Sequence, residues 1–152
     1  MTFPRRGLAA ALLPAAAAAA DSPATMARNL FARFVAAQNA HDFAAVRSTL
    51  LEFPRFLWVS DGVSYWGAEA LIRRNMAFHA QPLWRITPND ALAAAVEVNP
   101  STALLHTPLL LEVGRLEAPQ RYQLLITALC TATAAGWRIA ALLTADAKPA
   151  PV

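Results

Sequence analysis

Asp61 and His106 are the two side chains best suited to acid–base chemistry. Asp61 precedes Gly62 between two runs of bulky residues, and His106 stands in the middle of a leucine-rich run. A carboxylate or an imidazole in the wall of an apolar cavity would move protons next to a carbonyl group. Each also has a structural interpretation, which the pattern favours. Asp61 would begin an Asp-Gly turn. His106 would make one structural hydrogen bond as a neutral ring or, if it faces a cavity, pair with a ligand or with Glu112.

The remaining polar residues do not form a metal or cofactor motif. His41, His79 and His106 lack a metal-ligand spacing such as His-x-x-x-His, so we expect no metal. His79 falls near the end of a predicted helix, where a structural role is expected. The single cysteine, Cys130, is expected to be buried and inert. With no glycine-rich phosphate loop, the sequence predicts no cofactor.

Aromatic side chains are the candidates for an apolar ligand pocket, because flat rings pack well against apolar ligands. The candidates are Phe34, Trp58, Tyr65, Trp66 and Trp84. Ordinary core packing is the alternative interpretation of the same residues.

Residues 1–20 have the layout of a secretory signal peptide. Arg5 and Arg6 precede an apolar stretch that ends in small residues just before Asp21. The arginine pair resembles a twin-arginine signal, although Pro4 replaces the usual polar residue. The stretch is too short for a stable membrane span, and Pro14 interrupts it. We therefore expect a periplasmic or secreted protein, with a frayed alanine-rich helix as the alternative.

The charge balance argues against nucleic acid as a partner. The chain has 13 basic and 10 acidic residues, and removal of residues 1–20 lowers the basic count to 11. The basic residues are scattered, whereas a nucleic-acid-binding protein carries a basic stripe. Only 15% of the chain is charged and 57% is hydrophobic, which excludes a disordered chain and fits one domain over residues 21–146.

The elements that would position these side chains run from helices to strands. Ser22 and Asp42 are predicted to cap a first and a second helix, and a third helix follows Gly67. Asp61-Gly62 predicts a tight hairpin between two short strands. Strands are expected over residues 91–98, 102–113, 120–133 and 137–145, after a short strand or link at 81–88, and a polar disordered tail over 147–152.

The long strands are apolar on both faces. Leu105, Leu109 and Leu111 alternate with Leu104 and Leu110, whereas an antiparallel sheet with one solvated face would alternate with polar residues. The second face therefore needs a cover, and we expect a homodimer through the sheet face.

Four segments together resemble the NTF2-like superfamily, in particular its SnoaL-like members, over residues 24–144. They are residues 36–42 (AAQNAHD), 56–62 (FLWVSDG), 67–71 (GAEAL) and 136–139 (GWRI). The resemblance implies an α+β fold, the NTF2-like cone, in which three N-terminal helices pack on a curved antiparallel sheet around a pocket. It also places Asp61 where ketosteroid isomerases of the superfamily have their general base. However, Phe34 replaces the tyrosine that donates to the oxyanion there, and Leu125 and Ala128 stand near the position of the second, acidic donor.

The sequence therefore favours an exported binding or accessory module over an enzyme. Its pocket would take a small hydrophobic ligand. A purely structural dimerisation unit, with the cavity filled by side chains, is a further possibility. The catalytic alternative is a small SnoaL-type isomerase, cyclase or dehydratase that uses Asp61 or His106 as acid–base, although the missing oxyanion donors argue against isomerase chemistry.

Overall fold

Three helices precede most of the sheet, and two of them begin at the predicted caps. The computed structural model describes residues 21–52 and 54–148. The helices are α1 (Pro23–Asn39), α2 (Phe43–Thr49) and α3 (Ala68–His79), with a 3-10 turn, η1 (Asp90–Leu92), after them. The Ser22 hydroxyl accepts a hydrogen bond from the Thr25 N–H at 3.2 Å, and the Asp42 carboxylate accepts one from the Ala45 N–H at 2.9 Å. These caps satisfy backbone donors that the first helical turn leaves free.

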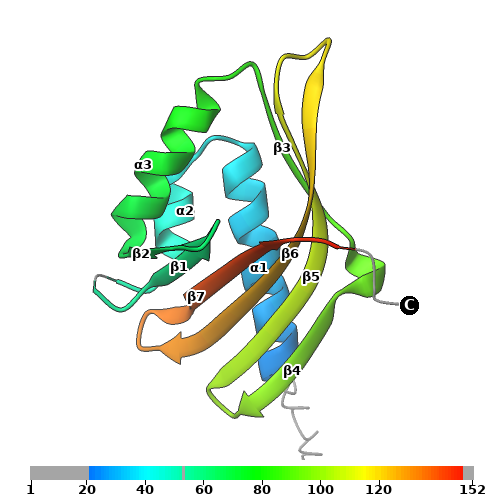
Figure 1. Ribbon diagram of the computed structural model, residues 1–152. Helices are drawn as coiled ribbons and strands as arrows, with labels where there is room; N and C mark the ends of the chain where they lie inside the picture. The colour runs from blue at the N-terminus through cyan, green and yellow to red at the C-terminus, as the bar shows by residue number, and fades with distance from the viewer. Residues whose placement is uncertain (1–20, 53, 149–152) are drawn as a thin grey trace, which may run out of the picture.

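The strands form one strongly bent sheet (Figure 1). They are β1 (Leu57–Ser60), β2 (Val63–Trp66), β3 (Leu83–Pro88), β4 (Ala94–Asn99), β5 (Thr102–Gly114), β6 (Pro119–Thr133) and β7 (Gly136–Asp146). Their order is β2-β1-β7-β6-β5-β3, and β4 also pairs with β5. β4 pairs with the first half of β5 and β3 with its second half. The predicted α+β class, three helices on a curved and mostly antiparallel sheet, is confirmed.

The β1–β2 hairpin contains the predicted two-residue turn. Ser60 pairs with Val63, so that Asp61 and Gly62 are the only residues between the strands. Both have positive φ, 54° for Asp61 and 74° for Gly62. Two consecutive residues with positive φ are typical of a type I′ turn, whose twist matches that of the flanking strands.

One strand pairing and one strand boundary differ from the prediction. β1 runs parallel to β7, so the sheet is mixed rather than wholly antiparallel. A hairpin forces its strands to be antiparallel, whereas β1 and β7 are far apart in sequence and no tight turn sets their direction. The predicted strand over 91–98 is shorter, because η1 occupies its beginning.

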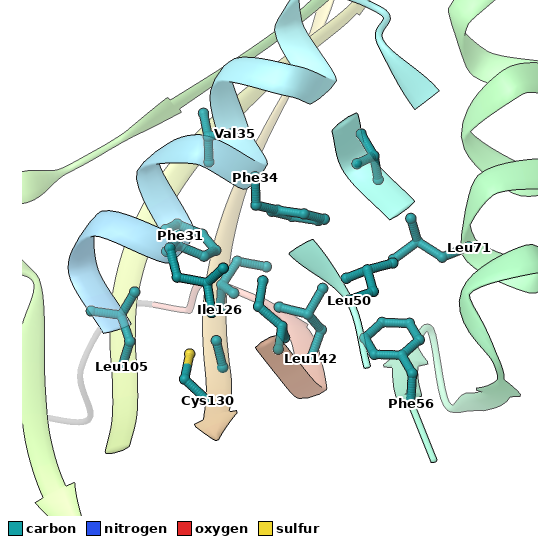
Figure 2. Packing of buried hydrophobic residues seen from close by; sticks show 14 of the residues in the cluster. Phe31, Phe34, Val35, Leu50, Phe56, Leu71, Leu105, Ile126, Cys130 and Leu142 are labelled. Carbon is teal, nitrogen blue, oxygen red and sulfur yellow. The ribbon is translucent and has the colours of Figure 1, made fainter. Parts of the chain in front are cut away.

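The core lies between α1 and the inner face of the sheet, the face that the helices cover. In Figure 2, Phe31 and Phe34 of α1 lie above Ile126 and Leu142 of the sheet. Phe56, fully buried, lies at the edge of the same cluster. Burial of a large apolar side chain stabilises a fold by about 1.5–3 kcal/mol. The contact between α1 and the sheet therefore contributes substantially to stability.

The outer face of the sheet, which no described helix covers, is apolar along its centre. Leu104 of β5 pairs with Leu129 of β6, which pairs in turn with Ala141 of β7. On the same face Leu143 is 46% exposed and Val96 of β4 is 58% exposed. The outer face thus exposes large apolar groups to solvent.

Two predicted segments fall wholly or mainly outside the described residues. The predicted signal peptide, residues 1–20, lies outside them. Of the predicted tail, 147–152, the structure describes only residues 147 and 148. Within the described part of the chain, no helix is both long enough and apolar enough to cross a membrane.

Candidate functional site

A cavity of about 1000 Å³ lies between α1, α3 and the inner face of the sheet. Phe34 of α1, Leu71 of α3, and Leu109, Ile126 and Leu142 of the sheet contribute apolar wall. The volume lies at the upper end of the range of small-molecule sites, which are mostly apolar with a few placed polar groups. The cavity is therefore the candidate functional site.

Three of the five predicted pocket aromatics line this cavity, and two do not. Phe34, Trp58 and Trp84 line it. Tyr65 is not part of the cavity wall, but its ring stacks on that of Trp58, with the centroids 4.8 Å apart. Trp66 is 60% exposed. The prediction for Trp66 was wrong because successive side chains of a strand point to opposite faces, and its neighbour Tyr65 faces the helices.

Asp61 is the first residue of the hairpin turn, and it also lines the cavity. The structural and the functional interpretation of this residue are therefore compatible. Its side chain is 70% exposed, and its Oδ2 accepts a hydrogen bond from Arg74 Nη2 at 2.9 Å. The Ser60 hydroxyl donates a longer bond to the same oxygen, at 3.3 Å. A carboxylate that is hydrated and paired with a cation lacks the apolar surroundings that make a strong general base.

Arg74 is a candidate site residue that the sequence pattern did not single out. Its Nη1 donates to the Tyr65 hydroxyl at 2.9 Å, in addition to the bond from Nη2 to Asp61. Its Cζ lies 5.6 Å from the Trp58 ring centroid, 5.5 Å from that of Tyr65 and 5.6 Å from that of Phe78. A guanidinium over aromatic faces is stabilised by the ring electrons.

The helical spacing of α3 was the signal that would have found Arg74. Leu71, Arg74, Asn75 and Phe78, at steps of three and four residues, all line the cavity. Such spacing places side chains on one helical face. An arginine within a stripe that also holds Leu71 and Phe78 is a candidate site residue.

A buried amide pair adds a second polar feature to the wall. Asn75 Nδ2 donates to Gln38 Oε1 at 2.7 Å, which ties α3 to α1. Gln38 is 4% exposed and Asn75 is 5% exposed, and both line the cavity. Whichever way the two amides are turned, this bond leaves one further N–H donor group and one carbonyl acceptor for other partners.

His106 lies away from the cavity, and the structure does not bring it together with Asp61. His106 pairs with Thr127 on the outer face, and its Nδ1 lies 2.9 Å from Thr127 Oγ1. The expected alternative partner, Glu112, instead accepts a hydrogen bond from Arg121 Nε at 3.0 Å. His106 therefore does not reach the cavity, because adjacent strand positions alternate between faces and His106 falls on the outer one.

His79 belongs to an aromatic cluster with His41, Phe43 and Trp84, at centroid distances of 4.2, 5.1 and 4.4 Å. Both its ring nitrogens and Trp84 Nε1 are buried without a hydrogen-bond partner among the described residues. Burial, with a smaller effect of the nearby His41, lowers the pKa of His79 to about 4. Burial raises the pKa of the Cys130 thiol to about 12. Within the described ranges, no group of three or more His, Cys, Asp or Glu residues could hold a metal ion.

Solved structures match this fold, although no family model and no curated protein matches the sequence. An NTF2-like superfamily protein from Salmonella enterica has a TM-score of 0.71 at 13% identity, covering 85% of this chain and 94% of its own. A candidate dehydratase of the NTF2-like family from Streptomyces avermitilis has a TM-score of 0.71 at 15% identity, covering 83% and 96%. An NTF2-like protein with a cystatin-like fold from Novosphingobium aromaticivorans has a TM-score of 0.69 at 17% identity, covering 84% of each chain.

These similarities concern the fold, since all three identities are below 20%. The narrower SnoaL-like resemblance stays a prediction. The bent sheet, the three helices over its inner face and the structural matches agree, and this chain has the NTF2-like, cystatin-like fold.

Proposed function

We propose that this chain is an exported module that binds a small, largely apolar molecule in the cavity between α1, α3 and the sheet. The observation that carries the proposal is the cavity itself, about 1000 Å³ in volume with Phe34, Trp58 and Trp84 in its wall. Rigid concave apolar surfaces of this size are typical of small-molecule sites. Export is inferred from the signal-like residues 1–20.

A dye that fluoresces in apolar surroundings tests the pocket. We expect the neutral probe phenylnaphthylamine to bind saturably with one site per chain. Replacement of Leu124, which lines the cavity, by Trp should weaken binding by about tenfold because the larger ring fills the space. The matched control is Leu116→Trp, since Leu116 is 65% exposed and should leave binding unchanged. Non-saturable dye binding, or equal effects of the two variants, would contradict the proposal.

Export has its own test. Expression of the full chain in a bacterium, followed by mass measurement of the periplasmic fraction, should give a mature protein that begins at Asp21. Recovery of the full-length mass from the cytoplasm alone would refute the signal peptide.

The second part of the proposal is a homodimer through the outer face. The support is the exposure of large apolar side chains on this face, such as Leu143 and Val96, since extended exposed apolar surface often marks a protein–protein interface. Leu143→Arg should convert a dimer to a monomer in sedimentation at micromolar concentration, whereas Leu116→Arg should not. A monomeric wild-type protein would refute the dimer without affecting the pocket.

A SnoaL-type enzyme that uses Asp61 is the second candidate function. It is favoured by the position of Asp61 at the cavity and by the name of the Streptomyces structure as a candidate dehydratase. The pairing of Asp61 with Arg74 weighs against it. If a substrate is found, Asp61→Asn should abolish turnover on this hypothesis, and unchanged turnover would exclude Asp61 as the base.

A further inference from the structure

We propose that the ligand of this cavity carries one carboxylate on an otherwise apolar body, and that Arg74 is the residue that binds this carboxylate. The inference rests on the proposed binding function and narrows its ligand to one chemical class. Three features carry it: the way Arg74 is held, the donors that it retains, and the weak competition from Asp61.

Arg74 is already fixed in place before a ligand arrives. Its guanidinium lies over the rings of Trp58, Tyr65 and Phe78 and donates to the Tyr65 hydroxyl. Its side chain is nevertheless 34% exposed, so one part of the group remains accessible. A preorganised guanidinium loses less conformational entropy on binding than a free one, and its planar geometry matches a carboxylate.

Arg74 retains donors for a second partner. A guanidinium has five N–H groups. Among the residues that the structure describes, Arg74 donates one hydrogen bond to Tyr65 and one to Asp61. The remaining N–H groups are available to a ligand in the cavity, whose wall includes Arg74.

Asp61 is a weak competitor for Arg74. Its carboxylate is 70% exposed and contacts the guanidinium through a single oxygen. Exposed ion pairs of this kind contribute little, because water solvates both groups and salt screens them. An apolar molecule with a carboxylate would add the burial of its body to the ion pair, and can therefore share or displace Asp61.

The Gln38–Asn75 pair adds buried polar groups to the wall of the same cavity. Asn75 follows Arg74 directly on α3, and both line the cavity. The pair is more than nine-tenths buried and keeps one donor group and one acceptor beyond its internal bond. These groups add hydrogen-bonding capacity to a wall that is otherwise mostly apolar, and Arg74 supplies its positive charge.

Calorimetric titration with naphthylacetate and the neutral naphthylacetamide tests this assignment, since the two probes have nearly the same shape and differ in charge. We expect the wild-type protein to bind naphthylacetate about tenfold more tightly, because charge-assisted hydrogen bonds are the stronger ones. Arg74→Met keeps a long side chain over the rings and should abolish the preference. Arg73→Met is the matched control, because Arg73 is exposed on the same helix, and it should preserve the preference.

Asp61→Asn is a second, independent variant that leaves Arg74 in place. Because it removes the competing charge, it should tighten naphthylacetate binding by a few-fold more than it changes naphthylacetamide binding. Equal affinity of the wild-type protein for the two probes, or loss of the preference in Arg73→Met, overturns the assignment of Arg74 and leaves the apolar pocket standing. If neither probe nor phenylnaphthylamine binds, the proposed function fails, and the carboxylate inference fails with it.

Discussion

Replacement of His79 by Phe should stabilise this protein, and more so in mild acid than at neutral pH. The His79 ring packs among His41, Phe43 and Trp84, with both nitrogens buried and unpartnered among the described residues. A buried polar atom without a partner costs about 1–3 kcal/mol. Phe keeps the aromatic packing and removes both polar atoms, but its larger ring adds some strain. We expect a net gain of about 1 kcal/mol at neutral pH.

The pH dependence follows from the lowered pKa of His79, about 4 against its ordinary 6.5. Between these two values the unfolded chain binds more protons than the folded one, so the free energy of unfolding falls as the pH falls. For a fully effective shift of this size, the free energy of unfolding at about pH 5 would be about 2 kcal/mol lower than at neutral pH. The ring is only half-buried, so solvent screens part of this effect and we expect roughly half of it. The His79→Phe variant should be free of this loss.

Urea unfolding at neutral pH and near pH 5, followed by tryptophan fluorescence, measures both effects. The advantage of His79→Phe over the wild type should grow from about 1 to about 2 kcal/mol between the two conditions. His41→Gln is the control, since it keeps the His79 ring and removes the smaller contribution to its pKa shift. That variant should retain most of the acid sensitivity. An equal advantage of His79→Phe at both pH values would refute the argument.

Two further predictions concern buried groups. Asn75→Leu should cost about 1–3 kcal/mol because it leaves the Gln38 amide without its partner, and adding Gln38→Leu should recover most of this in a double-mutant cycle of urea unfolding. Additive losses would contradict the coupling. Cys130, fully buried and with its pKa raised to about 12, should react with a thiol reagent far more slowly in the folded protein than in denaturant. Rapid labelling of the native protein would contradict the burial of Cys130 in β6.

Local signals were sufficient to predict the three helices, the hairpin and the long strands, and their order. Ser22 and Asp42 cap helices because their side chains reach backbone donors three residues away. Asp61 and Gly62 predict a hairpin because a two-residue turn requires two positive φ angles. All of these interactions join residues that are close in sequence, so the order of residue types along the chain is enough to predict them. The same holds for the apolar character of both sheet faces, which is visible in the alternation of the long strands.

Only the tertiary structure decided which of these residues meet. Arg74 reaches Asp61 and Tyr65 because α3 lies against the β1–β2 hairpin, and Asn75 meets Gln38 across two helices. The parallel pairing of β1 with β7 likewise joins segments far apart in the chain. The amino-acid sequence by itself determined the caps, the turn and the apolar periodicity, since these depend on neighbours along the backbone. The cavity wall is instead built from elements that are far apart in sequence. Which of their residues meet depends on how these elements pack in space, and the local spacing of residues along the chain does not determine that packing.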